Sequence, residues 1–399
     1  MKSFRSYLVV LTIALLIGAL LSCSNPASSP AKAWVVSTIA GSGAENAENP
    51  VDGQGTSAQF RDPKDVAVDA AGNLYVADHY HNRIRKITPG GLVSTIAGSN
   101  RTSNDIANGT RHRDGAGNQA LFWGPTGVAV DTDGNLYVAD SRNNRIRKLT
   151  PPTGEDATSY TVSTITIEDD NGQAITLSSP NGVEVDKDDN LYVAEFSGHQ
   201  IRKLELNEEK TAYTVSVIAG DGAQSFRDHT TGISAHFNNP TGVAVDTDSN
   251  LYVADYGNNR IRKITAAGAV GTIGGPKNIT PSAGYRDGPG DQALFRRPIG
   301  VAVDSRGNVY VTDTATGHSS ADHNQRIRKL TPNADKTSYT VSTIAGDGTA
   351  AYRDGPGTDP DPDTGARFNN PGGVAVDSSG NVVYVADTKN HRIRKIVYR

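Results

Sequence analysis

The sequence predicts an all-β fold in which six similar four-stranded sheets form a closed ring. Three observations lead to this prediction. The chain of 399 residues contains 42 glycines and 19 prolines, a turn-rich composition that does not suit a helical bundle. A short β-branched motif recurs along the chain. A strand-like segment that completes each sheet stands before the first copy of this motif and is missing after the last.

The first segment of the chain predicts export from the cytoplasm. Lys2 and Arg5 precede an apolar stretch that runs from Tyr7 to Leu21. Such a stretch is too short to span a bilayer as a helix and is typical of a secretory signal peptide. We therefore expect residues 1–22 to be a lipoprotein signal peptide.

The single cysteine of the chain, Cys23, excludes an internal disulfide and a Cys-based zinc site. It ends the stretch Leu20–Cys23, which resembles the lipobox of bacterial lipoproteins. This resemblance implies a lipidated Cys23 and a lipoprotein held at a membrane, either in the periplasm or on the cell surface. The Pro, Ser and Asn residues that follow indicate a flexible tether, so residues 23–34 are the lipidated cysteine and its tether. The alternative is an ordinary signal peptide with a cysteine near its end by chance.

From residue 35 to its end, the chain consists of copies of one repeated sequence unit. Variants of N-L-Y-V-A-D begin at Asn73, Asn135, Asn190, Asn250, Asn308 and Asn381. The closing acids are Asp78, Asp140, Glu195, Asp255, Asp313 and Asp387. They lie 62, 55, 60, 58 and 74 residues apart, a period typical of solenoids and propellers.

Each copy contains four strand-like pieces bounded by Gly, Asn, Asp or Pro. G-V-A-V-D precedes the motif, R-I-R-K follows it, and V-S-T-I-A-G is the fourth piece. A copy of the fourth piece at 36–41 precedes the first repeat, whereas the last R-I-R-K runs into the C-terminus. Pairing these two chain ends would remove an exposed sheet edge. We predict that residues 35–399 form a six-bladed β-propeller with four antiparallel strands per blade, closed by the N-terminal outer strand in the last blade.

The stretch from Asp114 to Lys148 carries the pattern D-G-x-G-x-x-A-x-F-x-x-P-x-G-V-A-V-D-x-x-G-N-L-Y-V-A-D-x-x-N-x-R-I-R-K. This pattern is similar to the NHL repeat, and the resemblance covers the chain after the tether. It implies a propeller. Propellers of this kind serve as protein-binding, RNA-binding and sugar-binding modules and as hydrolases or lyases, so the resemblance leaves the function open.

Two repeated features have structural interpretations. Asp131–Asn135 has the composition of a calcium loop, but its glycine stands at the wrong position, and a tight hairpin turn explains the segment. Asp140 and Arg145 recur at the same spacing in other copies, which indicates an ion pair that joins the second and third strands. Where Glu195 replaces the acid, Gln200 replaces the arginine. This joint change of acid and base supports a structural ion pair.

Sequence differences between blades concentrate on one face of the ring. In a four-stranded meander, this face carries the loops between the second and third strands and the long loops between blades; we call it the loop face. Its histidine, aromatic and arginine side chains around a channel mouth predict a binding surface. The candidate ligand-binding residues are His79, Tyr80, His81, Arg113, Trp123, Phe196 and Tyr256.

These observations favour a lipid-anchored binding or scaffold module outside the cytoplasm, with a protein or carbohydrate ligand on the loop face. No nucleophile stands beside a base in the sequence, so we do not expect an enzyme. A net charge of −4 and export argue against a nucleic-acid partner. We expect a monomer that meets the membrane only through its N-terminal lipid.

The alternative is a metal-dependent hydrolase or lyase like the gluconolactonases and amidating lyases, which have related propellers. The best metal-binding group for this function is His318, Asp322 and His323, in an insertion in the fifth blade. Its spacing matches no standard zinc motif, and either calcium or zinc fits the ligand types.

Overall fold

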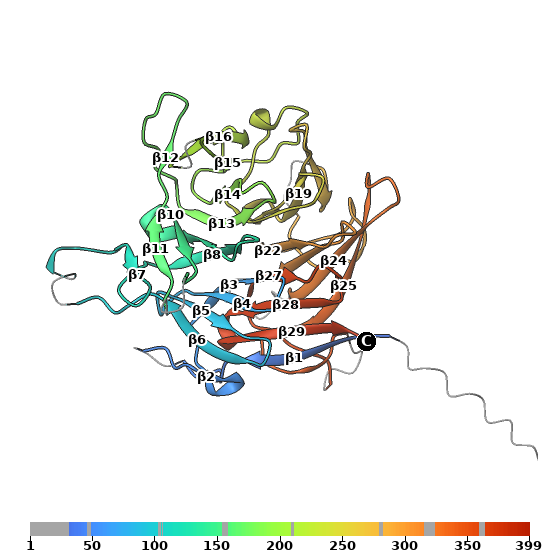
Figure 1. Cartoon of the computed structure of the whole chain (residues 1–399). Coiled ribbons are helices and arrows are strands. Elements are labelled where there is room, and N and C mark those ends of the chain that lie inside the picture. Colours follow the sequence, from blue (N-terminus) through green and yellow to red (C-terminus); the bar gives the residue numbers. More distant parts are fainter. Residues whose placement is uncertain are drawn as a thin grey trace, which may run out of the picture. The chain divides into compact units, whose positions relative to one another are not determined.

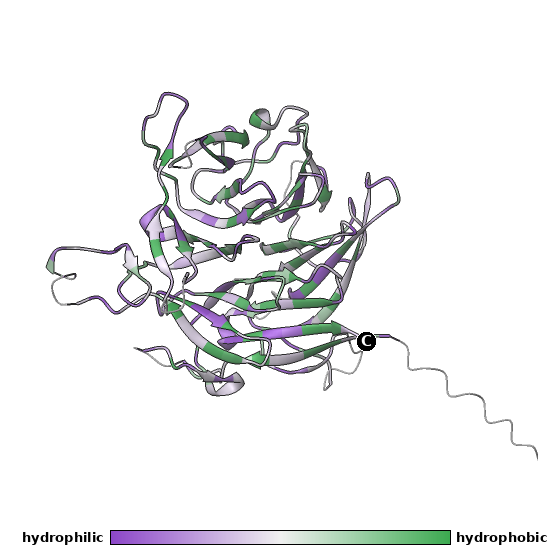
Figure 2. Cartoon of the chain, in the orientation of Figure 1, coloured by the Kyte–Doolittle hydropathy of each residue, from purple (hydrophilic) through white to green (hydrophobic). Residues whose placement is uncertain are grey.

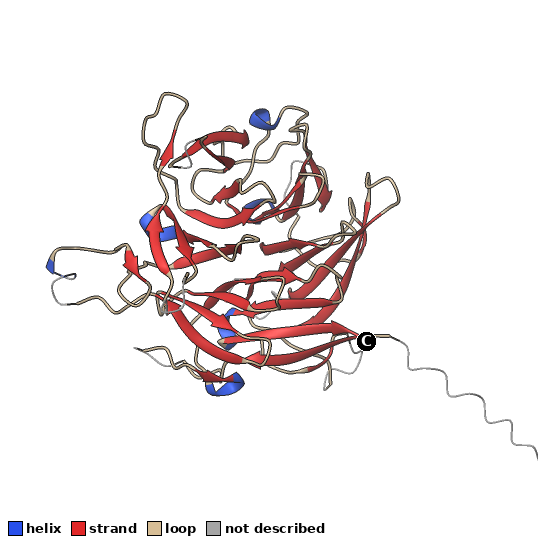
Figure 3. Ribbon diagram, in the orientation of Figure 1, coloured by secondary structure: helices blue, strands red, loops and turns tan. Residues whose placement is uncertain are grey.

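The computed structural model describes residues 32–45, 49–102, 105, 107–153, 159–208, 211–278, 282–314, 324–358 and 364–399. The chain divides into two units, Met1–Lys32 and Ala33–Arg399. All the strands described belong to the second unit, which is almost entirely β (Figure 1, Figure 3). The predicted signal peptide and Cys23 lie outside the described residues. Within these residues, no helix is long and apolar enough to span a membrane.

Six sheets, each built on four antiparallel strands, form the blades of a propeller, which confirms the predicted fold. From the inner to the outer edge, blade 1 contains β3 (Pro63–Val68), β4 (Leu74–Asp78), β5 (Arg83–Ile87) and β6 (Leu92–Ala97), and blade 2 contains β8 (Pro125–Val130), β9 (Leu136–Asp140), β10 (Arg145–Thr150) and β11 (Thr161–Thr164). In the same order, blade 3 contains β13 (Pro180–Val185), β14 (Leu191–Glu195), β15 (Gln200–Leu206) and β16 (Tyr213–Ala219), and blade 4 contains β17 (Pro240–Val245), β18 (Leu251–Asp255), β19 (Arg260–Ile264) and β20 (Val270–Gly274). Blade 5 contains β22 (Pro298–Val303), β23 (Val309–Asp313), β24 (Gln325–Pro332) and β25 (Tyr339–Gly348), and blade 6 contains β27 (Pro371–Val376), β28 (Val382–Asp387), β29 (Arg392–Tyr398) and β1 (Trp34–Ala40).

The last blade is built from both ends of the propeller, as predicted. Strand β1 pairs antiparallel with β29, with Val35 opposite Val397. Inner strands contact one another in sequence around the ring, and β27 contacts β3 to complete it. Figure 1 shows β1, in blue, beside the red β29.

Five of the six sheets have a fifth strand that the four-strand prediction omitted. These two-residue strands are β2 (Gly53–Gln54), β7 (Gly115–Ala116), β12 (Ile167–Glu168), β21 (Gly288–Pro289) and β26 (Gly355–Pro356). All five come from the loop that leads into a blade and pair with that blade's outer strand; four of them run antiparallel to it, whereas β12 runs parallel to β16. The added strand gives that outer strand a hydrogen-bonding partner along part of its edge.

Short 3-10 helices occur in the loops. They are η1 (Gly55–Ser57), η2 (Ser141–Asn143), η3 (Gly232–Ser234), η4 (Tyr256–Asn258) and η5 (Thr388–Asn390). Of these, η2, η4 and η5 directly follow a closing acid and end at a residue in the left-handed conformation. The chain thus reverses tightly on the loop face.

The hydrophobic core consists of six clusters, each shared by two consecutive blades. Every sheet therefore buries both of its faces. This explains why the second strand of a blade, such as β9, is buried at all five positions and does not alternate between apolar and polar residues. Apolar residues lie along the strands of each blade (Figure 2).

The turn between the first two strands is a hairpin, as predicted. In blade 2, Asp131 Oδ1 accepts a hydrogen bond from the backbone N–H of Asn135 at 2.8 Å, and Oδ2 accepts one from the Asn135 side chain at 2.8 Å. The hydroxyl of Tyr137 donates to the same oxygen at 3.3 Å. Both carboxylate oxygens of Asp131 therefore accept hydrogen bonds from residues of the same hairpin.

Candidate functional site

A central cavity of about 450 Å³ lies inside the ring of inner strands. Residues of all six inner strands line it, together with side chains from the loop face, including Phe196, Tyr256 and Thr388. Each of these three residues follows directly after the closing acid of its blade. The loop between the second and third strands thus delivers side chains to the mouth of the cavity.

The closing acids are structural. Asp140 is fully buried. Its Oδ1 accepts a hydrogen bond from Trp123 N at 2.8 Å, and its Oδ2 accepts one from Asn143 Nδ2 at 2.8 Å. Oδ2 also forms an ion pair with Arg147 Nη1 at 3.0 Å. The acid therefore joins the incoming loop, the reversing turn and the third strand.

The expected pair between Asp140 and Arg145 is wrong. These residues are opposite each other in the strand register, but the Arg145 guanidinium donates to the carbonyl of Asn143 at 2.9 Å. Arg147 lies two residues further into β10, where its side chain is fully buried beside the acid. The acid therefore pairs with the buried arginine and not with the arginine directly opposite it in the strand register.

The joint change of Glu195 and Gln200 does not mark the ion pair of blade 3 either. In blade 3, Glu195 forms an ion pair with Arg202 at 2.6 Å although Gln200 replaces the first arginine. The longer glutamate still accepts a backbone hydrogen bond from the incoming loop, at Ser178 N. The pair is therefore kept with a different acid.

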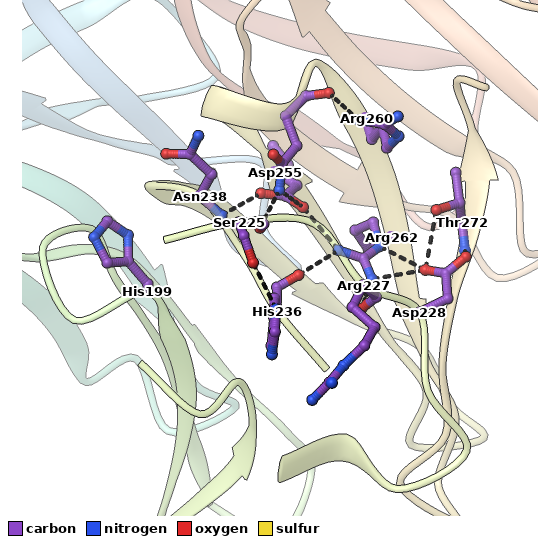
Figure 4. A network of polar contacts seen from close by, with 12 residues as sticks. His199, Ser225, Arg227, Asp228, His236, Asn238, Asp255, Arg260, Arg262 and Thr272 are labelled. Carbon is purple, nitrogen blue, oxygen red and sulfur yellow. Dashed lines mark hydrogen bonds and ion pairs between the residues drawn. The ribbon is translucent and has the colours of Figure 1, made fainter. Parts of the chain in front are cut away.

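Figure 4 shows the complete network in blade 4. The buried Arg262 bonds to Asp255 at 2.8 Å and to Asp228 at 2.6 Å. Asp228 in turn accepts hydrogen bonds from the backbone and hydroxyl of Thr272, both at 3.1 Å, and so reaches the outer strand. The same arrangement in blade 6 joins Arg394 and Asp354 to Thr38 of β1. It therefore also holds the ring closed.

Among the predicted ligand-binding residues, His81 belongs to this structural network. Its side chain is buried, and Nδ1 lies 2.8 Å from Asp78 Oδ2. In blade 2 the equivalent position holds Asn143, which binds the closing acid in the same way. His81 therefore completes the turn of blade 1 and does not face the mouth.

His79 and Tyr80 have different environments. The His79 side chain is buried, with Nδ1 3.0 Å from the carbonyl oxygen of Pro125, and burial lowers its pKa to about 4. Tyr80 is exposed. Its ring lies 5.6 Å from the guanidinium of Arg61, 5.8 Å from that of Arg142 and 6.0 Å from the Lys389 ammonium. Tyr80 thus stands among cations from blades 1, 2 and 6.

Trp123 and Arg113 are also separated by the fold. The Arg111 guanidinium stacks on the Trp123 ring at 3.9 Å, and Arg142 lies 6.0 Å from the same ring. Arg113 instead pairs with Asp105 at 2.7 Å within its own loop. Trp123 joins the surroundings of Tyr80, whereas Arg113 holds the loop together.

Phe196 and Tyr256 meet at the mouth of the cavity. Their ring centroids are 6.1 Å apart and tilted by 56°. They come from neighbouring blades 3 and 4, and both line the cavity. The Arg297 guanidinium lies 5.8 Å from the Tyr256 ring. Such a pair offers a flat apolar surface to a ligand.

Two acids in the cavity were missed by the sequence analysis. Asp65 Oδ1 and Oδ2 accept hydrogen bonds from Val66 N at 2.9 Å and from Val128 N, in the next blade, at 3.1 Å. Glu184 Oε1 accepts one from Val185 N at 3.0 Å. Burial raises the pKa of each carboxyl to about 7, and the charge of Asp65 further raises that of Glu184.

Lys64, which precedes Asp65 in β3, also lines the cavity. Burial lowers its pKa, and the charges of Lys389 and Arg142 lower it further, while Asp62 opposes the shift. Within the described ranges, its ammonium has no hydrogen-bond or ion-pair partner. A half-buried cation without an ion-pair partner at a cavity wall suits an anionic ligand.

The predicted metal ligands His318, Asp322 and His323 lie outside the described residues. In the part of the chain that the structure describes, no three His, Cys, Asp or Glu side chains gather as metal ligands would. The hypothesis of a calcium or zinc site therefore stays a prediction.

Comparison with known proteins agrees with the repeat pattern. A model of the Teneurin NHL domain matches residues 92–286, and an NHL-repeat model matches residues 60–87, 295–320 and 368–396. The chain belongs to the NHL-repeat family. NHL repeat-containing protein 2 of Bos taurus is 30% identical over 83% of this chain and 46% of its own length. This chain thus spans about half the length of that relative.

Solved structures share the NHL propeller fold. A Bacteroides thetaiotaomicron protein of unknown function superposes with a TM-score of 0.59 and 21% identity, covering 92% of this chain and 76% of its own. An auxiliary nutrient binding protein from the same organism has a TM-score of 0.56 and 16% identity, covering 92% and 77%. At these identities the likeness concerns the fold alone.

The NHL repeats themselves contain the signal for the two missed acids. Five blades have glycine before the valine of G-V-A-V-D, at 127, 182, 242, 300 and 373, whereas blade 1 has Asp65. Five blades have alanine after that valine, whereas blade 3 has Glu184. Aligning the repeats of this one chain would have identified both acids as departures from the pattern.

Proposed function

We propose that this NHL propeller is a lipid-anchored binding module outside the cytoplasm that captures a protein or glycan ligand at the mouth of its central cavity. One observation carries the proposal. The side chains that depart from the repeat, including Asp65, Phe196 and Tyr256, meet at this cavity, whereas the repeated polar residues are used within the blades. Side chains that differ from the repeat pattern and are not needed to hold the blades together indicate a ligand-binding site where they line a cavity.

The anchor is tested at Cys23. Replacing Cys23 by Ser in the full chain should abolish incorporation of an alkyne-labelled fatty acid and release the protein from the membrane fraction, because the lipid attaches to the thiol. The measurement is in-gel fluorescence of labelled cells, with Ser22→Ala as the matched control. Equal labelling of wild type and Cys23→Ser would contradict the anchor.

The binding face is tested at the aromatic pair. Phe196→Ala should weaken binding of ligands found on glycan and protein arrays by at least tenfold, because truncating an aromatic hot spot costs about 2 kcal/mol or more and about 1.4 kcal/mol is tenfold. Leu92→Ala, which alters an exposed apolar side chain at the start of outer strand β6, is the control and should bind normally. Equal losses in both variants, or no ligand on either array, would contradict the proposal.

A further inference from the structure

Cations gather on one side of the cavity mouth. We call this cluster the rim patch; it comprises Arg61, Lys64, Tyr80, Trp123, Arg142 and Lys389. Its residues come from blades 6, 1 and 2, which are consecutive in the closed ring. The patch stands out because the whole chain carries a net charge of −4.

Part of this positive charge is neutralised locally. Lys389 forms an ion pair with Asp62, and Arg61 lies 3.8 Å from Glu45. Within the described part of the chain, Lys64 and the exposed Arg142 form no ion pair, although Asp62 lies near enough to act on Lys64, so their charges are available to a ligand. Arg111 adds a further guanidinium, stacked on Trp123.

The cavity beneath the mouth has the opposite character. Asp65 and Glu184 line its wall, and their carboxyl groups can accept hydrogen bonds from a ligand. Across the mouth from blade 1, Phe196 and Tyr256 present their rings. A ligand that fits must therefore carry an anionic group, several neutral hydrogen-bond donors and an apolar face.

We infer that the mouth binds the end of an anionic saccharide, with the acidic group on the rim patch, hydroxyl groups on Asp65 and Glu184, and a sugar face on the Phe196–Tyr256 pair. The inference rests on the proposed function and narrows its ligand class. Sugars combine hydroxyl donors with an apolar C–H face, and about 450 Å³ is enough for one or two rings. An acidic peptide would place further carboxylates against Asp65 and Glu184 and would lack the hydroxyl groups.

The inference is tested by titrating the full chain calorimetrically with digalacturonate, neutral digalactose, a sulfated galactose disaccharide and tetraglutamate. Digalacturonate should bind at least tenfold more tightly than digalactose, and added salt should weaken only the charged ligands. The sulfated disaccharide distinguishes a general requirement for an anion from a requirement for a carboxylate. Tetraglutamate should bind at least tenfold more weakly than digalacturonate.

Variants separate the rim patch from a general effect of charge. Arg142→Gln and Lys64→Gln should each weaken digalacturonate binding by at least fivefold and leave digalactose binding unchanged. Other blades have Thr, Asn, Ile or Gly at the position of Lys64, so the fold accepts an uncharged residue there. Lys187→Gln is the control, because Lys187 lies in an exposed hairpin turn on the face opposite the loop face. It should leave the binding of both ligands unchanged.

The outcomes distinguish the two proposals. Equal affinity for charged and neutral saccharides, or an equal loss with Lys187→Gln, would overturn the inference and leave the binding module intact. Tighter binding of tetraglutamate than of digalacturonate would replace the saccharide by an acidic peptide. The absence of any saccharide or protein ligand would overturn the proposed function itself.

Discussion

Replacing Arg147 by Met should lower the free energy of unfolding by about 3–5 kcal/mol, the usual cost of leaving one partner of a buried ion pair uncompensated. The Arg147 side chain is fully buried between Asp140 and Asp114. It also donates hydrogen bonds to the carbonyl oxygens of Leu121 and Arg113. Methionine fills much of the same space but leaves the buried carboxylate of Asp140 without its cation.

The matched control for this experiment is Arg145→Met. Arg145 belongs to the same strand, and its guanidinium donates a hydrogen bond to the carbonyl oxygen of Asn143. We expect this change to cost less than about 1 kcal/mol, because an exposed or half-exposed polar contact contributes little. Urea unfolding followed by tryptophan fluorescence measures both values. A larger loss for Arg145→Met than for Arg147→Met would show that the opposed pair, and not the buried one, holds the blade.

Replacing Glu184 by Ala should stabilise the protein at pH 8 and have little effect at pH 4. The unfolded chain releases the Glu184 proton near pH 4.5, whereas the folded protein releases it near pH 7. Between these values the folded state binds more protons, so the free energy of unfolding falls as pH rises and stays low above pH 7. At about 1.4 kcal/mol per unit of pKa difference, the stabilisation by Glu184→Ala at pH 8 can reach at most about 3 kcal/mol. Because the carboxylate faces a cavity, we expect about 1–2 kcal/mol.

Urea unfolding at pH 4, 6 and 8 measures this effect. Alanine is the residue that the other five blades have at the position of Glu184, so the fold accepts it. Glu184→Gln keeps the side-chain volume and should give the same gain at pH 8. Glu205→Ala removes an exposed acid from β15 and should show no such pH dependence. A loss of stability at pH 8 in both Glu184 variants would mean that the ionised carboxylate is stabilising.

The sequence predicted the ring because six complete four-stranded blades are possible only when the first and last strand-like segments of the chain share one blade. It chose the wrong arginine for Asp140 because the register places Arg145 opposite the acid. Which guanidinium is desolvated depends on how the next loop covers the strand, and spacing within one strand does not contain that information. The spacing also did not reveal that the His81 ring bonds to Asp78, because this contact depends on the tertiary fold.

The amino-acid pattern by itself determined the number of blades, their strand order and the closure of the ring, because these follow from a repeat of local β propensity and turn residues. Only the tertiary structure decided which side chains meet at the cavity. Asp65, Glu184 and Tyr256 lie on different blades and are far apart in the chain. The circular arrangement of the blades brings them to one cavity, and burial there, which no local pattern specifies, raises the pKa of both acids.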